Sequence, residues 1–198
     1  MAKKKLDRTN LPAAPGQMPT QGDGLPRYTA RFTRDGLRFS GPSGADLLTV
    51  ALVPIALRVA WRSYTEHRDG QTTISQAPAY SDAGLNPSMA VQVLGYEVGE
   101  AGERQLVVLH ANGYAAGDLG AIVARLDREE PARYCVSMTV GGADTQRAVG
   151  KGSYYPLVLV GTRAVSDMTL DAVLDEMATK NPERWAAGWN EPRSWSRR

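Results

Sequence analysis

The side chains of this sequence that are best suited to nucleophilic chemistry are Cys135, His110 and Asp144. A thiol, an imidazole and a carboxylate can serve as nucleophile, general base and orienting group when they lie within hydrogen-bond reach of one another. Their spacing along the chain does not bring them together, and no catalytic signature surrounds Cys135. An enzyme with a Cys135/His110 site is therefore the last of three hypotheses, and we expect a protein without catalytic residues.

A second chemical motif is the stretch Gly150-Lys151-Gly152-Ser153, which is similar to a phosphate-binding loop. The Walker pattern needs a glycine where Thr145 stands and a Ser or Thr where Gly152 stands. It must also open a helix, whereas the residues that follow are typical of a strand. We therefore expect an exposed hairpin tip, from which Arg147 and Lys151 could contact phosphates.

Metal and cofactor sites are not expected. His67 and His110 are the only histidines, and Cys135 is the only cysteine. These counts exclude a multi-cysteine ligand set and an internal disulfide, and no histidine pair has the spacing of a zinc site. We expect no metal ligands and no cofactor.

Positive charge is concentrated at the two ends of the chain. Residues 1–26 hold four basic residues against two acidic ones, and residues 190–198 hold three against one, although the whole chain has a net charge of only +2. Basic ends of this kind attract acidic partners, or they contact neighbouring copies of the same chain. With the hairpin tip included, the residues expected to contact nucleic acid are Lys3, Lys4, Lys5, Arg8, Arg147, Lys151, Arg193, Arg197 and Arg198.

The C-terminal tail combines tryptophan with arginine. Trp185, Trp189 and Trp195 lie within eleven residues of one another, after the last expected helix. Tryptophan beside arginine can stack on nucleic-acid bases, can anchor one subunit on another, or can cover the core of its own domain. The tail is expected to lack regular structure, and the three tryptophans are candidate assembly anchors.

The chain divides into three segments by composition. Residues 1–26 form a basic arm rich in proline and glycine, with too few large apolar side chains to fold alone. Residues 27–182 are expected to form a single domain, a size that can bury a full core. Residues 183–198 form the Trp/Arg-rich tail.

Alternation of apolar and polar residues predicts the strands of the domain. It predicts a hairpin over residues 28–39, a second over 91–110, and a strand over 134–140 that pairs with 155–160. Residues 69–90 are rich in polar residues, proline and glycine, and they are expected to form a long loop.

Apolar residues at helical spacing predict the helices. Residues 117–128 and 167–180 each carry one apolar stripe. The apolar segment 44–66 is expected to form a buried helix kinked near Pro54, with a strand followed by a helix as the alternative. The expected fold class is therefore α+β, an antiparallel sheet built from hairpins with about three helices packed on it.

The leading functional hypothesis is a non-enzymatic structural subunit that self-assembles, as in a viral or phage particle, with its basic ends facing neighbours and nucleic acid. The alternative is a soluble nucleic-acid-binding accessory protein. The expected partners are further copies of the chain and nucleic acid. No membrane contact is expected, because the apolar stretch 47–57 is about half of a bilayer span. A virion or the cytoplasm is the expected location, because the start of the chain lacks the apolar stretch of a signal peptide.

Overall fold

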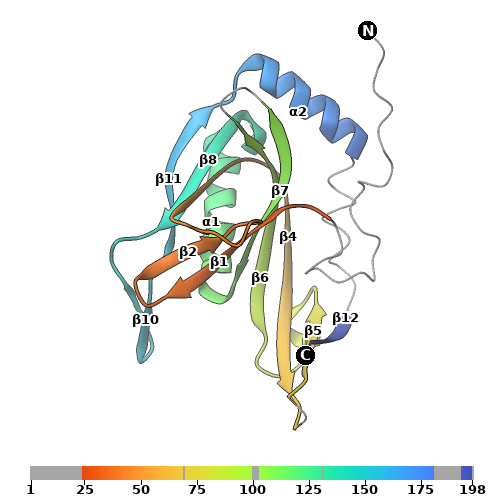
Figure 1. Ribbon diagram of the computed structural model, residues 1–198, viewed down its shortest axis with the longest axis vertical. Coiled ribbons are helices and arrows are strands. Elements are labelled where there is room, and N and C mark those ends of the chain that lie inside the picture. Colours follow the sequence, from red (N-terminus) through yellow and green to blue (C-terminus); the bar gives the residue numbers. More distant parts are fainter. Residues whose placement is uncertain (1–23, 69, 100–102, 131, 181–192, 198) are drawn as a thin grey trace.

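A strongly curved mixed sheet dominates the fold (Figure 1). The computed structural model describes residues 24–68, 70–99, 103–130, 132–180 and 193–197. The sheet consists of β1 (Arg27–Thr33), β2 (Gly36–Ser40), β3 (Asp46–Leu47), β4 (Thr49–Glu66), β5 (Thr72–Ala77), β6 (Ser88–Val98), β7 (Arg104–Asn112), β8 (Val136–Gly142), β11 (Leu157–Ala164) and β12 (Arg193–Arg197). Its order is β11-β8-β4-β6-β7-β1-β2-β3, and β5 pairs with both β4 and β12. Strands β9 (Arg147–Val149) and β10 (Gly152–Tyr154) form a separate hairpin.

Two α-helices accompany the sheet in the described part of the chain. They are α1 (Gly113–Glu129) and α2 (Asp167–Lys180), and two short 3-10 turns occur at η2 (Tyr80–Asp82) and η3 (Arg133–Cys135). The expected α+β class with about three helices is therefore wrong, because most of the chain is strand and only two α-helices form. The sheet is also mixed rather than purely antiparallel, since β1 runs parallel to β7.

The error arises mainly from residues 44–66, which were expected to form a helix and instead form β3 and the 18-residue strand β4. A continuous apolar run does not distinguish a buried strand from a buried helix. Here the β-branched residues Val50, Val53 and Ile55 favour the strand. Pro54 is tolerated because it lies at an irregularity in the pairing with β6, between Pro54 and Ala56.

Strand β4 connects all parts of the sheet. Its first residues pair with β8, its middle pairs with β6, and its last residues pair with β5. The irregularity at Pro54 lies where the pairing changes from β8 to β6, so β4 can bend there and belong to both halves of the curved sheet.

The other predicted elements have mixed outcomes. The hairpins β1–β2 and β6–β7, the pairing of β8 with β11, and the helices α1 and α2 are confirmed. The expected long loop over 69–90 is wrong in part, because it contains β5 and the turn η2. The expectation of an irregular tail is wrong for residues 193–197, which form β12 on the outer edge of β5.

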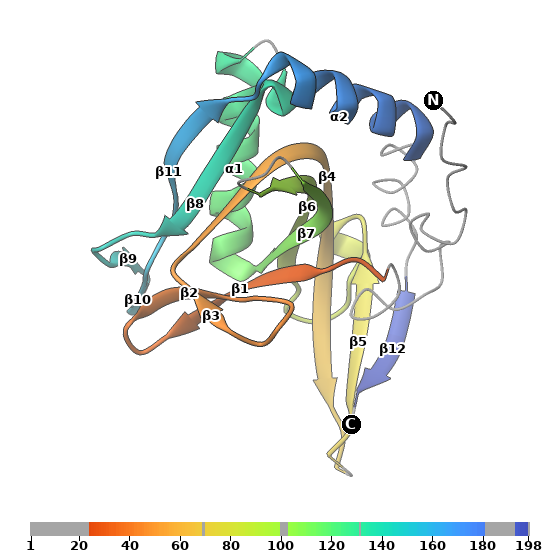
Figure 2. The same cartoon turned by 45° about the horizontal axis from the view of Figure 1, so that its top comes forward.

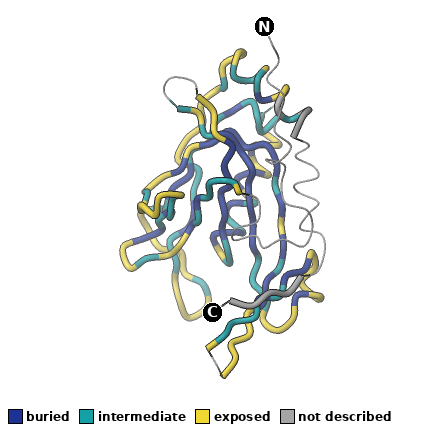
Figure 3. Tube along the Cα trace, turned by 45° about the vertical axis from the view of Figure 1, so that its right-hand side comes forward, coloured by how far each residue is buried: buried dark blue, intermediate teal, exposed yellow. Residues whose placement is uncertain are grey.

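One face of the sheet packs on α1, and we call it the α1 face. Helix α1 lies inside the curl of the sheet, against β6, β7 and β11 (Figure 2). The core between them is apolar throughout and includes Phe39, Leu52, Leu109, Leu119 and Met138, none of them more than 2% exposed. Figure 3 shows this burial along the middle of the sheet, with the hairpin tips exposed.

The opposite face of β4, β6 and β7 has two parts. Toward α2 it is apolar, where Val173 packs in a second, smaller core that includes Tyr96 and Val108. Farther along the same strands the residues become polar. Arg58, Gln92 and His110 occupy directly paired positions on neighbouring strands, so their side chains share this face.

Candidate nucleic-acid interface

Three aromatic side chains from distant parts of the sequence meet at one end of the sheet. We call Phe32, Tyr114 and Tyr154 the aromatic cluster. The rings of Tyr114 and Tyr154 are stacked, with centroids 4.8 Å apart and an interplanar angle of 23°. Phe32 contacts Tyr154 edge-on at 5.8 Å. Phe32 is 45% exposed and Tyr114 is 56% exposed, so the cluster presents aromatic surface to solvent rather than to a core.

The cluster is held together by Asp118 in the first turns of α1. One carboxylate oxygen of Asp118 accepts hydrogen bonds from the Tyr154 hydroxyl at 3.3 Å and from the Arg147 guanidinium at 3.4 Å. The other oxygen accepts the backbone N–H of Leu157 at 3.0 Å. Because Asp118 binds both ends of the segment 147–157, it fixes the β9–β10 hairpin beside Tyr114.

Basic side chains lie on the two hairpins that carry Phe32 and Tyr154. Arg147 lies on β9 with its side chain 61% exposed, and Lys151 lies exposed at the turn between β9 and β10. Arg34 is exposed at the tip of the β1–β2 hairpin, the same hairpin that carries Phe32. The two hairpin tips lie near each other at one end of the molecule (Figures 1 and 2). Aromatic faces with nearby cations are the features by which proteins hold single-stranded nucleic acid.

The stretch Gly150-Lys151-Gly152-Ser153 is not a phosphate loop of the Walker type. It forms the turn of the β9–β10 hairpin and the start of β10, and Gly150 has a positive φ of 56° that suits such a turn. The expectation of an exposed hairpin tip is confirmed. Its contact with nucleic acid stays a prediction.

A second group of polar residues lies on the face opposite α1, and it is buried. We call Arg58, Arg62, Gln76, Gln92 and His110 the donor-rich cluster, and each is at most 8% exposed. Nε of Arg58 donates to Oε1 of Gln92 at 2.8 Å, and Nε of Arg62 donates to Oε1 of Gln76 at 2.8 Å. His110 lies between Arg62 and Gln92, with Nε2 3.4 Å from Nη1 of Arg62 and Nδ1 3.1 Å from Nε2 of Gln92.

Burial and like charges set the protonation of this cluster. Burial lowers the pKa of His110 well below 6.5, and the nearby guanidiniums of Arg62, Arg27 and Arg58 lower it further. Burial also lowers the pKa of Arg62 to about 10. His110 is therefore neutral at physiological pH, while the arginines remain charged.

The structure separates the three residues considered for nucleophilic chemistry. His110 faces Arg62 and Gln92 on β7, Cys135 ends the turn η3 before β8, and Asp144 is exposed after β8. Cys135 was expected on a strand, and the structure instead places it half-buried in the η3 turn. Whether this chain is an enzyme stays untested.

Most of the residues predicted at the chain ends fall outside the described part of the structure. This applies to Lys3, Lys4, Lys5, Arg8, Trp185, Trp189 and Arg198. Arg193, Trp195 and Arg197 lie in β12, at the positions paired with Gln76, Ile74 and Thr72 of β5. Their roles in nucleic-acid contact and assembly stay predictions.

Sequence reasoning missed the aromatic cluster and the donor-rich cluster. The signal for the first was available in part, because Phe32 lies shortly before Arg34 and Tyr154 lies shortly after Lys151. The signal for the second was the pattern Arg58-x-x-x-Arg62 within an apolar segment, but the same spacing also fits one face of a helix. Only the strand assignment places Arg58 opposite Gln92 and Arg62 opposite Gln76.

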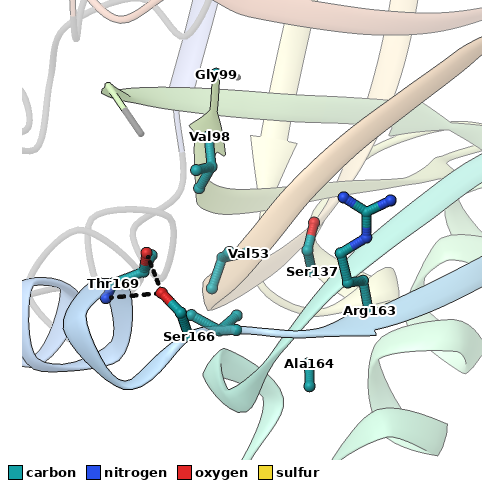
Figure 4. A pocket seen from close by; sticks show the side chains of 9 residues that line it. Val53, Val98, Gly99, Ser137, Arg163, Ala164, Ser166 and Thr169 are labelled. Carbon is teal, nitrogen blue, oxygen red and sulfur yellow. Dashed lines mark hydrogen bonds between the residues drawn. The ribbon is translucent and has the colours of Figure 1, made fainter. Parts of the chain in front are cut away.

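The surface also has a hollow of about 350 Å³ between the end of β6 and the start of α2 (Figure 4). Arg163 and Ser137 lie side by side at this hollow, on the paired strands β11 and β8. Ser166 lies at the start of α2, where its hydroxyl accepts the backbone N–H of Thr169 at 3.3 Å. Besides the guanidinium of Arg163, the hydroxyls of Ser137 and Thr169 line the hollow, while Ser166 is occupied in capping the helix.

Metal ligands and membrane-spanning helices are both absent from the described residues. These residues contain no group of three or more histidine, cysteine or acidic side chains placed to hold a metal ion. Within the same ranges, neither helix has the length and apolar character needed to cross a bilayer.

Among known proteins, no family model, no curated sequence and no solved structure matches this chain.

Proposed function

We propose that this protein is a nucleic-acid-binding accessory protein that holds single strands by stacking their bases on the aromatic cluster. The observation that carries the proposal is the exposed surface of Phe32 and Tyr114, which meet at Tyr154 from three separate elements. Large aromatic side chains normally avoid water. A surface that holds three of them together, beside the hairpin tips that carry Arg34 and Lys151, is suited to unstacked bases.

Single strands fit this surface better than a duplex does. In a duplex the bases are stacked on one another, so their faces are not available to side chains. The aromatic cluster offers ring faces but few hydrogen-bonding groups to read base edges. Arg34, Arg147 and Lys151 can meet the phosphates on either side of a stacked base.

Fluorescence anisotropy with a labelled oligothymidine tests the proposal. Tyr114→Ala should weaken binding about tenfold, because stacking on one base contributes roughly 1–3 kcal/mol. Tyr80→Ala is the matched control, since Tyr80 is 59% exposed but packs against Trp61 outside the cluster. A duplex of the same length should bind more weakly than the single strand. Equal affinities for the Tyr114 and Tyr80 variants would contradict the proposal.

The salt dependence of binding tests the basic residues separately. Removing one phosphate contact should reduce the slope of log K against log salt by about 0.7 for a single strand. Arg147→Ala and Lys151→Ala should each reduce the slope by this amount. Arg125→Ala is the control, because Arg125 is exposed on α1 and pairs with Glu129. If all three variants keep the original slope, the β9–β10 hairpin does not contact phosphate.

Self-assembly into a structural subunit is the second candidate, and the edge strand β11 favours it. β11 ends the path of the large sheet, and Val160 on it is 58% exposed. An exposed strand edge can pair with a strand of another copy. Native mass measured with and without nuclease tests this candidate, with Val160→Lys expected to reduce the mass of any assembly. A monomer in all conditions would rule it out.

A further inference from the structure

The hollow at the α2 end of the sheet brings an arginine, two hydroxyls and several valines together (Figure 4). Val53 comes from β4, Val98 from the end of β6, and Ser137 from β8. Arg163 comes from β11, and Thr169 lies in the first turn of α2. Residues far apart in the sequence therefore converge on one volume of about 350 Å³, which is within the range of small-molecule sites.

The polar side chains of the hollow have hydrogen-bonding capacity left over. Within the described ranges, no hydrogen bond or ion pair engages the guanidinium of Arg163 or the hydroxyl of Ser137. The two residues are directly paired across β11 and β8, so their side chains share a face. The Thr169 hydroxyl accepts from Ser166 at 2.9 Å, which leaves its own hydrogen to donate. The hollow therefore offers donors to a ligand that carries acceptors.

Apolar side chains occupy the space between these polar groups. Val53 is 1% exposed and lies at the bottom of the hollow, whereas Val98 is 39% exposed at its side. In Figure 4, both valines lie between the Arg163–Ser137 pair and Thr169. A ligand held by Arg163 therefore meets valine methyl groups, and removing these from water favours a ligand with an apolar part.

The charge around the hollow favours a ligand with a single negative charge. Among the described residues that line it, Arg163 alone is charged, and the carboxylate of Glu103 lies next to Gly99 at the rim. A phosphate dianion would be repelled by this carboxylate, and its oxygens would cover the valines without burying any apolar surface of their own. A planar carboxylate instead matches one guanidinium through two parallel hydrogen bonds.

We infer that this hollow binds a small aliphatic monocarboxylate. Its two oxygens accept hydrogen bonds from the guanidinium of Arg163, and the hydroxyl of Ser137 donates another. Its hydrocarbon part packs on Val53 and Val98, and Thr169 lies at the far side of that apolar surface. Such a group is present both in a free branched short-chain acid and at the C-terminus of a peptide that ends in an aliphatic residue.

This inference goes beyond the proposed binding of nucleic acid and does not depend on it. Ser137 and Arg163 lie at one end of the β8–β11 pair, whereas Leu157, which donates to Asp118, lies at the other end. The hollow and the β9–β10 hairpin are therefore at opposite ends of these strands (Figure 1). Tyr114→Ala should keep carboxylate binding and Arg163→Gln should keep oligothymidine binding, so either site can fail while the other stands.

Isovalerate, a branched short-chain acid, is the direct probe. Saturation-transfer NMR on the full chain should give a dissociation constant on the order of 1 mM, because so small a ligand buries few atoms. Isovaleramide has the same shape without the charge and should bind about tenfold more weakly. Acetate has the charge without the branched chain and should also bind about tenfold more weakly. No saturable binding of isovalerate, or equal affinity for its amide, overturns the inference.

Replacing Arg163 tests the guanidinium. Arg163→Gln should weaken isovalerate binding about tenfold, because the paired, charge-assisted hydrogen bonds are lost. Arg163→Lys keeps the charge but lacks the planar fork, so its affinity should be intermediate. Arg125→Gln is the matched control, since it removes an exposed arginine of α1 and should leave binding unchanged. Unchanged isovalerate affinity in Arg163→Gln overturns the inference.

A pair of valines tests the apolar wall. Val98→Thr keeps the volume but places a hydroxyl against the hydrocarbon chain, so isovalerate binding should weaken about threefold while acetate binding stays the same. Val59→Thr is the control, because Val59 is 38% exposed, almost as much as Val98, and lies outside the hollow. Equal isovalerate affinity in the two variants overturns the inference.

Competition distinguishes the two sources of the carboxylate. If the hollow takes peptide ends, N-acetyl-glycyl-leucine should displace isovalerate and bind more tightly than it does. If the hollow takes free acids, this dipeptide should bind more weakly, because its amide groups would have no hydrogen-bond partner beside the valines. Either order of affinities supports the carboxylate site. Displacement of isovalerate by the dipeptide's C-terminal amide, which lacks the carboxylate, overturns it.

Discussion

The two helices of this protein both carry apolar residues at helical spacing, yet they differ in how strongly those residues are gathered on one face and in how far they are buried. Six residues of α1 are buried, and Leu119 and Val123 on it are fully inaccessible. In α2, burial is described for residues 167–175 and 177, and among these Val173 is the single buried residue, while Met168 is 78% exposed. Helical spacing predicted both helices correctly, and the weaker segregation of apolar residues in α2 agrees with its smaller buried face.

The sheet contributes to this difference as well. Helix α1 lies inside the curl, where the strands β6, β7 and β11 approach it from several directions (Figure 2). Helix α2 meets the outer face only where β6 and β7 carry apolar residues such as Tyr96 and Val108. Beyond that point the same strands carry the buried polar residues Gln92 and His110 instead of apolar ones.

The largest effect is expected in the core that α1 forms with the sheet. Leu119→Ala should lower the free energy of unfolding by about 3–5 kcal/mol, because it removes a fully buried side chain and leaves a cavity. Arg125→Ala, on the exposed side of the same helix, should change it by less than about 0.5 kcal/mol. Urea denaturation gives both values. Similarly small losses in both variants would show that the packing of α1 against the sheet contributes little to the free energy of unfolding.

The curvature of the sheet depends on close approach at Gly95. A Cβ atom at this position would lie 2.4 Å from Leu52 Cδ1 and 2.6 Å from the carbonyl oxygen of Val53. Gly95→Ala should therefore lower the free energy of unfolding by about 3 kcal/mol, since the backbone of β4 cannot move away. Gly120→Ala in α1, where nothing lies within 4 Å, should instead raise it by about 0.5–1 kcal/mol. Thermal unfolding of both variants checks the opposite signs.

A matched pair of valines compares the two helices directly. Val123 on α1 and Val173 on α2 are both 0% exposed. Val123→Ala should cost about 2 kcal/mol, and Val173→Ala about 1 kcal/mol, because the smaller core under α2 can adjust around the lost methyl groups. Hydrogen exchange should show faster exchange confined to α2 in the Val173 variant. Exchange that accelerates across the whole sheet would mean that α2 is part of the main folding unit.

The parts of the fold that sequence predicted correctly have local signals. The hairpin over 28–39 alternates around a turn, and the α2 stripe has a clear stop at Asn181-Pro182. The segment 44–66 failed because its type depends on non-local pairing. β4 is a strand since β8, β6 and β5 each provide a partner for part of it, and no local property of the segment contains that information.

The candidate sites show the same limit. Arg147 and Lys151 were found because charge is visible in the sequence, and the structure confirms their exposure on the hairpin. Phe32, Tyr114 and Tyr154 are far apart in the chain, so only the folded sheet brings their rings together. His110 was considered as a base for Cys135. The strand register instead places His110 on β7 beside Gln92 of β6, with Arg62 of β4 on its other side.

The last effect concerns the polar part of the outer face and depends on pH. Because burial lowers the pKa of His110 in the folded protein, protonation favours the unfolded chain. The contribution of neutral His110 is present above the unfolded pKa of about 6.5, and stability should fall below it, by at most about 1.4 kcal/mol per pH unit. Urea denaturation between about pH 7.5 and pH 5 in a phosphate-free buffer measures this slope. His110→Gln should flatten the slope, whereas His67→Gln should leave it unchanged. An equally steep slope in the His110 variant would show that another group causes the loss of stability at low pH. The polar part of this face would then not differ from the apolar part in its pH dependence.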